Sequence, residues 1–404
     1  MIKVIDSMCG SGKSTKMFDM MNRMYAEDIS KRFLYVTPFL SEIDTRVPEE
    51  MPMLEFATPK NIGEGKVESL KNLVECGRNI ATTHVLFSML TPEIVEALIE
   101  QDYVLVIDEA LDCVRQHDDI NRSDVSALLT SGMVTVNYRQ RGKLYWNEEV
   151  YPNHTGKYSE VRNMCKLGVA YSYKDQFLMF EYPPKLLSEL SDVFILTYLF
   201  NGSDMRCWID LHEIPYQILN NEDLGLLSEK VIKDKVRENL NILVPQSLRK
   251  TVQKNGTLSK RWFAKTKADD IKKYQKIMRS VVSNTKARAG EVFWTTFKSQ
   301  TDKLKGVGYT RGISEDMPAF IPMNTRATND YRDYRLCMYG CNLFKNPVQA
   351  NYIREQGVDV DEDTYALSEM IQFIWRGRIR QYEPMDVLIL SNRMRRLLED
   401  WLNE

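Results

Sequence analysis

Histidine and cysteine, the usual ligands of zinc, are few in this sequence. The 404 residues include four histidines and seven cysteines, and no two cysteines form a C-x-x-C pair. Because the cysteines are scattered and odd in number, they predict neither a zinc site nor a disulfide framework, and they are typical of a reducing compartment.

The sequence also lacks long apolar runs and an excess of one charge. Its longest strongly apolar run, residues 193–200, is too short to span a membrane, so we expect no membrane association. The first motif starts so close to residue 1 that we expect no signal peptide. A net charge of −2 shows no overall bias toward nucleic acid, although a local basic patch can still bind it. We therefore expect a cytoplasmic protein of about two domains.

The strongest motif is KVIDSMCGSGKST, residues 3–15, in which a β-prone run leads through a glycine-bearing turn into a helical pattern. This is the context of a phosphate-binding loop, whose backbone N–H groups and helix N-terminus hold phosphate oxygens. The lysine can reach the β- and γ-phosphates and the following serine can hold Mg²⁺, which predicts ATP and Mg²⁺ as cofactors. Ser7 stands where glycine or alanine is usual, and an ordinary glycine-rich turn is the alternative. The predicted nucleotide-binding residues are Cys9, Gly10, Ser11, Gly12, Lys13, Ser14 and Thr15, with Lys13 expected on a solvent-facing loop.

A second motif, VLVIDEAL at residues 104–111, is a fully apolar run that ends in two acids. Such a run predicts a buried parallel strand, and ligands bind at the carboxyl ends of these strands. Asp108 is the expected metal-holding acid together with Ser14, and Glu109 is the expected base that activates the attacking water. A strand that simply ends in solvated acids is the alternative.

The D-E-A-L segment resembles the D-E-A-x box of superfamily 2 helicases and translocases, and weaker matches to the other motifs of that family follow in order. These are residues 35–40 (motif Ia), 81–84, 195–198 (motif III), 293–298 (motif IV) and 324–331 (motif V). The resemblance implies nucleic-acid contacts at Thr37, Pro38, Thr83, Thr296, Arg326 and Thr328.

Residues 372–380, QFIWRGRIR, resemble motif VI of the same family. Arginines from a second domain that reach the γ-phosphate only on closure would couple hydrolysis to domain motion. The resemblance implies catalytic roles for Arg376 and Arg378, and nucleotide contacts for Gln372 and Arg380. Trp375 stands where the family usually has glycine, so the register is ambiguous, and a basic amphipathic helix is the alternative.

The segment 245–288 is rich in basic residues with interleaved aromatics, which is typical of nucleic-acid binding. Lys272, Lys273 and Lys276 are its candidate phosphate contacts. The alternative is a solvated helical face, because Ile271 and Tyr274 fall on the opposite, apolar side at helical spacing.

Strands alternating with helices predict βαβ units and an α/β fold. The expected strands are residues 3–6, 32–36, 53–56, 79–82, 104–107, 193–196, 290–296, 334–339 and 386–390, with short antiparallel candidates at 134–139, 142–147 and 176–182. Together with the resemblance, this predicts two RecA-like P-loop NTPase domains with parallel sheets, at residues 1–203 and 290–404. A mostly β insertion is expected at about 118–184, and a basic helical linker subdomain at 204–289.

The resemblance implies an ATP hydrolase of the superfamily 2 helicase type that moves on or unwinds nucleic acid, with ATP bound between its two domains. It is most similar to replication-type DNA helicases of bacteriophages, which favours single-stranded or forked DNA over RNA and suggests replication or recombination proteins as partners. A phage-encoded protein of this kind would act in the cytoplasm of its bacterial host. A phage packaging ATPase and an ATP-gated nucleic-acid clamp without processive unwinding are the alternatives.

Overall fold

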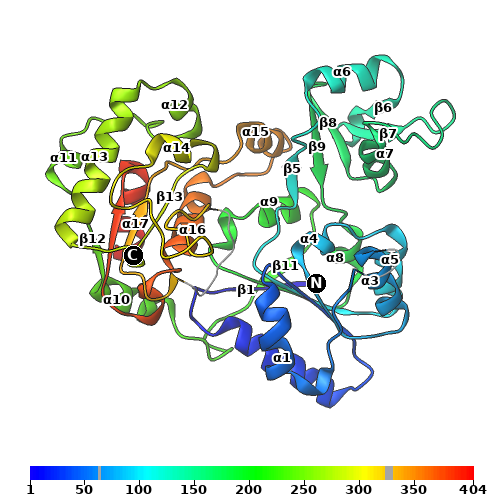
Figure 1. The fold of residues 1–404 in the computed structure, drawn as a ribbon. Coiled ribbons are helices and arrows are strands. Elements are labelled where there is room, and N and C mark those ends of the chain that lie inside the picture. Colours follow the sequence, from blue (N-terminus) through cyan, green and yellow to red (C-terminus); the bar gives the residue numbers. More distant parts are fainter. Residues whose placement is uncertain (62–64, 324–330) are drawn as a thin grey trace. The chain divides into compact units, whose positions relative to one another are not determined.

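A computed structural model describes residues 1–61, 65–323 and 331–404 of the chain (Figure 1). The chain forms two compact units. The first comprises Met1–Ser7, Gly12–Leu226 and Asn346–Asp361, and the second comprises Met8–Ser11, Leu227–Lys345 and Glu362–Glu404. Each unit contains its own parallel sheet, as expected of an α/β protein with two such domains.

A six-stranded parallel sheet forms the centre of the first unit, in the order β11-β1-β10-β4-β2-β3. The strands are β1 (Ile2–Asp6), β2 (Phe33–Thr37), β3 (Ile80–Thr83), β4 (Val104–Asp108), β10 (Val193–Thr197) and β11 (Tyr216–Ile218). Every residue of β2, β4 and β10 is buried, which explains why the first four residues of each strand are apolar. Asp6 pairs with Thr197, and Leu196 pairs with Asp108, so the carboxyl ends of three central strands meet at one edge.

The helices of the first unit connect these strands. They are α1 (Lys13–Glu27), α2 (Val47–Glu50), α3 (Lys66–Glu75), α4 (His84–Phe87), α5 (Pro92–Glu100), α8 (Lys185–Glu189) and α9 (Asp204–Leu211), with a π-helical turn η1 (Glu42–Arg46) and 3₁₀ turns η2 (Pro52–Leu54) and η4 (Phe200–Gly202).

The predicted mostly β insertion between β4 and β10 is a five-stranded antiparallel sheet in the order β5-β9-β8-β7-β6. Its strands are β5 (Val114–Gln116), β6 (Val134–Asn137), β7 (Lys143–Trp146), β8 (Ala170–Tyr173) and β9 (Phe177–Glu181), with α6 (Arg122–Thr130), α7 (Ser159–Lys166) and the 3₁₀ turn η3 (Tyr138–Gln140). We call residues 114–181 the middle domain.

One helix from the C-terminal half of the chain packs on the middle domain. This helix, α15 (Pro347–Glu355), belongs to the first unit although the residues on both sides of Asn346–Asp361 belong to the second. The fully buried Tyr352 packs its ring 5.5 Å from the ring of Tyr173 on β8, and its hydroxyl donates to Glu181 at the end of β9.

The second unit has a four-stranded parallel sheet in the order β12-β15-β14-β13. Its strands are β12 (Leu240–Ile242), β13 (Val292–Thr295), β14 (Leu336–Tyr339) and β15 (Met385–Ile389). Its helices are α10 (Glu229–Asn239), α11 (Gln246–Arg249), α12 (Lys260–Lys265), α13 (Ala268–Thr285), α14 (Thr301–Leu304), α16 (Glu362–Ile374) and α17 (Asn392–Asn403), with 3₁₀ turns η5 (Lys298–Gln300) and η7 (Arg378–Gln381). The apolar side of α13 packs with Trp294 of β13 and Leu388 of β15 in one core.

The structure divides residues 204–289 differently from the predicted boundaries. β11 pairs with β1 in the first sheet and β12 pairs with β15 in the second, so this segment extends both sheets and the division falls after Leu226. Both strands have only three residues, too few for an apolar pattern to reveal them.

The strand predicted at residues 53–56 is wrong. Pro52 opens the 3₁₀ turn Pro52–Leu54 there, because proline presets the backbone for a turn and has no N–H to donate to a sheet. Within the described residues, no helix combines the length and apolarity needed to cross a lipid bilayer.

Candidate active site

The phosphate-loop motif folds as the strand, turn and helix that its sequence predicts. β1 ends at Asp6, and α1 begins at Lys13. Between them, Gly10 and Gly12 have φ angles of 82° and 93°, in the left-handed region that side chains with a Cβ rarely adopt. Ser11 N–H donates to the carbonyl of Met8, which closes the turn. The loop therefore presents the N-terminus of a 15-residue helix to any bound anion.

Asp108 lies at the carboxyl end of β4, beside the first turn of α1. The Ser14 hydroxyl donates to Asp108 Oδ2 at 3.4 Å, and the buried Tyr35 hydroxyl donates to the same oxygen at 3.2 Å. Burial is the main cause that raises the pKa of Asp108 well above its usual range, and the negative charges of Glu42 and Glu109 raise it further. Asp108 Oδ1 is buried and has no hydrogen-bond partner among the described residues. A hydroxyl beside a buried carboxylate with an unsatisfied oxygen is an oxygen donor set that suits Mg²⁺.

Glu109, the second predicted acid, has an unusual backbone conformation for a residue with a side chain. Its φ is 65°, and its N–H donates to the carbonyl of Leu196 on β10 at 2.8 Å. Lys13 Nζ lies 3.9 Å from Glu109 Oε1. Lys13 is only 7% exposed, so the expectation of a solvent-facing lysine is wrong: its stem is covered at the first position of α1. The structure thus brings Lys13, Ser14, Asp108 and Glu109 together, as the motifs predict.

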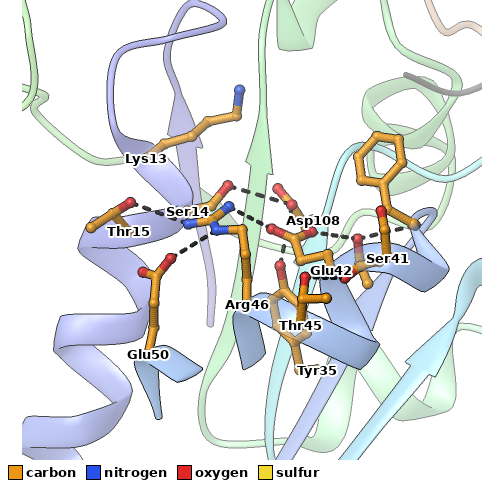
Figure 2. A network of polar contacts seen from close by, with 12 residues as sticks. Lys13, Ser14, Thr15, Tyr35, Ser41, Glu42, Thr45, Arg46, Glu50 and Asp108 are labelled. Atoms are coloured by element: carbon orange, nitrogen blue, oxygen red, sulfur yellow. Dashed lines mark hydrogen bonds and ion pairs between the residues drawn. The ribbon is translucent and has the colours of Figure 1, made fainter. Parts of the chain in front are cut away.

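Glu42 is a third acid at this site, which the sequence analysis missed (Figure 2). It opens the π-helical turn η1 after β2, is 7% exposed, and lies within hydrogen-bonding reach of the carboxyl group of Asp108. Glu42 Oε2 accepts a hydrogen bond from the Thr37 hydroxyl at 2.8 Å, and Oε1 pairs with Arg46 at 2.7 Å. Two buried carboxyl groups in contact favour a proton or a cation between them.

Arg46 connects this acid to the phosphate-loop helix. Its guanidinium pairs with Glu50 at 2.8 Å and donates to the Thr15 hydroxyl at 3.2 Å (Figure 2). The same guanidinium lies 5.0 Å from the ring centroid of Phe18. A contiguous polar network therefore runs from the end of β2 to the first turn of α1. The sequence signal for it is weak, because the wider π-helical turn that places Glu42 and Arg46 has no recognisable residue pattern.

Two of the three predicted nucleic-acid contacts of the first unit, Thr37 and Thr83, have structural roles in this conformation. Thr37 is completely buried and holds Glu42, which leaves it no surface for a ligand. Pro38 is half-buried. Thr83 is half-buried and caps α4 by accepting a hydrogen bond from Leu86 N–H. The neighbouring His84 places Nε2 2.8 Å from the main-chain carbonyl of Asp108.

Among the predicted contacts of the second unit, Thr296 is completely buried and its hydroxyl donates to the Gly340 carbonyl, so it too has no surface for nucleic acid. Arg326 and Thr328 lie outside the described residues. The three candidate lysines are exposed on one side of α13, opposite Ile271, Tyr274 and Ile277. Lys272 and Lys273 pair with Asp269 and Asp270 of the same helix at 3.3 and 2.7 Å, which reduces the basic character of this face.

The predicted motif VI residues lie at the end of α16 and directly after it, in the second unit. Arg376 is 4% exposed, donates to the Met323 carbonyl at 3.2 Å and lies 4.8 Å from the Phe373 ring centroid. Burial lowers its pKa to about 10, so it stays charged near neutral pH. Arg378 pairs with Glu383 at 3.2 Å, whereas Arg380 is exposed. Gln372, half-buried on α16, donates weakly to the Ser368 hydroxyl.

Known sequences match this chain along almost its whole length. The family models for the YonV middle domain and the YonV C-terminal Rossmann-like domain match residues 114–180 and 234–402. The SPbeta prophage-derived protein YonV of Bacillus subtilis (strain 168) is 32% identical over 419 residues, which covers 99% of this chain and 98% of that protein.

Solved structures resemble the chain at much lower identity. Xpd4 of S. tokodaii is 10% identical, with a TM-score of 0.51 over 99% of this chain and 93% of its own. The DUF1998 helicase MrfA bound to DNA and AMPPNP gives a TM-score of 0.37 at 12% identity, over 100% of this chain and 48% of its own. The likeness to Xpd4 shows a shared fold, in agreement with the α/β fold with parallel sheets that the sequence predicts.

Proposed function

This chain belongs to the YonV family, and we propose that it is an ATP-dependent helicase or translocase that couples ATP hydrolysis to movement on, or unwinding of, DNA. The observation that carries the proposal is the group of Lys13, Ser14, Asp108 and Glu109 at one edge of a parallel sheet. These are the groups that phosphoryl-transfer enzymes use to hold the phosphates, hold the metal and activate water.

Each side chain has a role that its surroundings support. The N–H groups of the loop and the Lys13 ammonium bind the phosphates, while Ser14 and Asp108 hold Mg²⁺. When bound, Mg²⁺ neutralises charge on the phosphates. Glu109 Oε1, held near Lys13 Nζ, takes the proton from the attacking water. We further propose that Arg376 and Arg378 of the second unit stabilise the charge that develops on the γ-phosphate.

The proposed substrate is single-stranded or forked DNA, and this part of the proposal does not come from the geometry of the site. It is supported by the helicase-type order of motifs along the chain and by the fold shared with Xpd4. The relative in Bacillus subtilis is prophage-derived, which supports a phage-encoded protein that works with replication or recombination proteins in its host.

The decisive experiment measures ATP turnover with and without single-stranded DNA, and strand displacement on a forked duplex, in the same preparation. We expect DNA to stimulate turnover and ATP to drive displacement, and we expect Lys13→Ala to lose both, with turnover at least about 10²-fold lower. Lys13→Ala turnover within about threefold of wild type would exclude the loop as the nucleotide site. Stimulated turnover without displacement would instead favour translocation alone or the ATP-gated clamp.

A further inference from the structure

One half of a face of the middle-domain sheet is left open. Side chains alternate across a strand, so Lys143 and Tyr145 of β7 share a face, while Leu144 and Trp146 are buried on the other. On the β8–β9 side, α15 covers the face that carries Lys143 and Tyr145, and the contact is made by Tyr352. On the β6–β7 side, Tyr145 and its cross-strand partner Thr135 are exposed.

The hairpin that borders this open half is basic and aromatic. Its sequence, YRQRGKLY at residues 138–145, contains three cations, two tyrosines and no acid. Arg141 pairs with Glu181 at 3.0 Å, whereas Arg139 and Lys143 form no ion pair with any described residue. The hairpin therefore presents uncompensated positive charge beside its aromatic rings.

Both tyrosines are exposed but fixed. Tyr138 is 69% exposed, and its hydroxyl donates to Asp175 Oδ2 at 2.8 Å. Tyr145 is 42% exposed, and its hydroxyl donates to Gln140 Oε1 at 2.6 Å. Lys143 Nζ lies 5.8 Å from the ring centroid of Tyr145. Rings anchored at the hydroxyl lose little conformational entropy when a ligand stacks on them.

We propose that the hairpin of residues 138–145 is a second nucleic-acid site, which binds single-stranded nucleic acid by stacking bases on Tyr138 and Tyr145 and by pairing phosphates with Arg139 and Lys143. Exposed aromatic rings beside unpaired cations are the combination that single strands recognise without sequence preference. A duplex hides the faces of its bases, and an acidic peptide has the charge but lacks the aromatic bases that stack on tyrosine. The observations therefore favour a single strand over both.

The test measures binding of a labelled oligothymidylate to the full-length protein by fluorescence anisotropy, without nucleotide. We expect Tyr138→Ala and Tyr145→Ala each to weaken binding about tenfold. The matched variants Tyr138→Phe and Tyr145→Phe keep the rings and lose only the hydroxyl contacts that fix them, so they should bind more weakly than wild type but more tightly than the alanine variants. Because the rings are exposed, circular dichroism should show all four variants folded.

Charge is tested separately by the salt dependence of the same binding. Arg139→Ala and Lys143→Ala should each reduce the slope of log affinity against log salt concentration by about 0.7. Lys166→Ala is the control, since this exposed lysine of α7 already pairs with Glu148 at 3.1 Å and should leave the slope unchanged.

Three results would overturn the proposal: alanine variants that bind like wild type, phenylalanine variants as weak as the alanine ones, or polyglutamate that competes as well as the oligonucleotide. The last would assign the hairpin to acidic proteins instead. Because the assay contains no nucleotide, its outcome does not depend on whether the protein hydrolyses ATP, and loss of the ATPase proposal would leave this one standing.

Discussion

Glu109 combines a strained backbone with a charged side chain at the end of a buried strand. A left-handed conformation costs a residue with a Cβ on the order of 1 kcal/mol, and the hydrogen bond from its N–H to Leu196 holds it in place. Such strain is retained where it aims a side chain. We expect Glu109→Gln to bind Mg²⁺ and ATP as wild type does, while hydrolysis falls about 10²–10⁴-fold.

The prediction for Glu109 is checked by measuring nucleotide affinity and single-turnover hydrolysis side by side. Loss of affinity together with turnover would assign Glu109 to metal holding rather than to proton transfer. Glu109→Gly is a useful companion, because glycine adopts the left-handed region without strain. Glu109→Gly should be no less stable than wild type, and it should hydrolyse ATP as slowly as Glu109→Gln does.

Glu42 offers a second test at the same site. Removing its charge takes one of two adjacent carboxylates away from the proposed metal position beside Asp108. A charge several ångströms away at an intermediate dielectric contributes on the order of 1–2 kcal/mol. We therefore expect Glu42→Gln to raise the Mg²⁺ concentration for half-maximal ATP turnover about tenfold.

Glu50→Gln is the matched control for Glu42. Both acids pair with Arg46, at 2.7 and 2.8 Å, but of the two it is Glu42 that lies beside the carboxyl group of Asp108. If Glu42 acts through the metal, Glu50→Gln should leave the Mg²⁺ requirement unchanged. An equal rise in both variants would show instead that each acts by releasing Arg46 from Thr15.

At the scale of elements, most strands of four or five residues are predictable from the sequence, whereas the three-residue strands and β8 are not. β4 and β10 each contain a run of four apolar residues that no helix pattern matches, and both are placed within a residue of the prediction. β8 was missed because its sequence, AYSY, alternates small and aromatic residues and becomes buried only between β9 and α15. Its burial depends on a helix some 180 positions away in sequence, which local patterns cannot reveal.

The same distinction holds for the candidate site. Lys13, Ser14, Asp108 and Glu109 lie in local motifs that physical chemistry can interpret, whereas Glu42 reaches Asp108 only through the π-helical turn after β2. Thr37 and Thr296 occupy motif positions that predict contact with nucleic acid. Both are completely buried, and this burial depends on the packing of each sheet, which local sequence does not reveal.

The contact of α15 with the middle domain is itself testable. Burial and the adjacent Glu181 raise the pKa of Tyr352, so its hydroxyl stays protonated and donates to the buried carboxylate. Tyr352→Phe leaves that carboxylate one donor short, which costs about 1–3 kcal/mol. We expect faster amide hydrogen exchange in α15, at unchanged exchange in the second sheet.

Tyr173→Phe is the control for this contact. Tyr173 donates to Glu355, an exposed carboxylate that also pairs with Lys174 at 2.6 Å, so water and the lysine replace the lost hydroxyl. The opening free energy of α15, measured by amide exchange, should change by no more than about 0.5 kcal/mol. A loss of protection equal to that of Tyr352→Phe would mean that ring packing, and not the buried hydrogen bond, holds the helix.

At the scale of the whole molecule, sequence order and spatial units differ. The chain leaves the second unit after Lys345, and residues 346–361 complete the first unit with α15. It then returns to the second unit, where α16 begins at Glu362. A fragment ending at Leu226 would lack Tyr352 and expose the apolar surface around Tyr173. Functional experiments on this protein therefore require the full chain.

The arginines of the second unit test whether both units serve one nucleotide. We expect Arg378→Ala to lower DNA-stimulated turnover about 10³-fold or more without changing ATP affinity measured in the absence of DNA. Arg378→Lys should not restore it, because lysine lacks the planar fork. The thermal midpoint should hardly move, since Arg378 is about one-third exposed and its ion-pair partner Glu383 is exposed.

Arg376 is buried and Arg380 is exposed, so comparing their alanine variants separates loss of turnover from loss of stability. Arg376→Ala should lose stimulated turnover and also lower the thermal midpoint, because its buried guanidinium holds the Met323 carbonyl. Arg380→Ala, at an exposed position, should be milder in turnover and neutral in stability. If Arg380→Ala were severe and Arg378→Ala silent, the motif register would shift by one step. If Arg378→Ala and Arg380→Ala both kept full stimulation, and Arg376→Ala lost activity only in proportion to its stability, the proposed closure of two domains on one ATP would have to be abandoned.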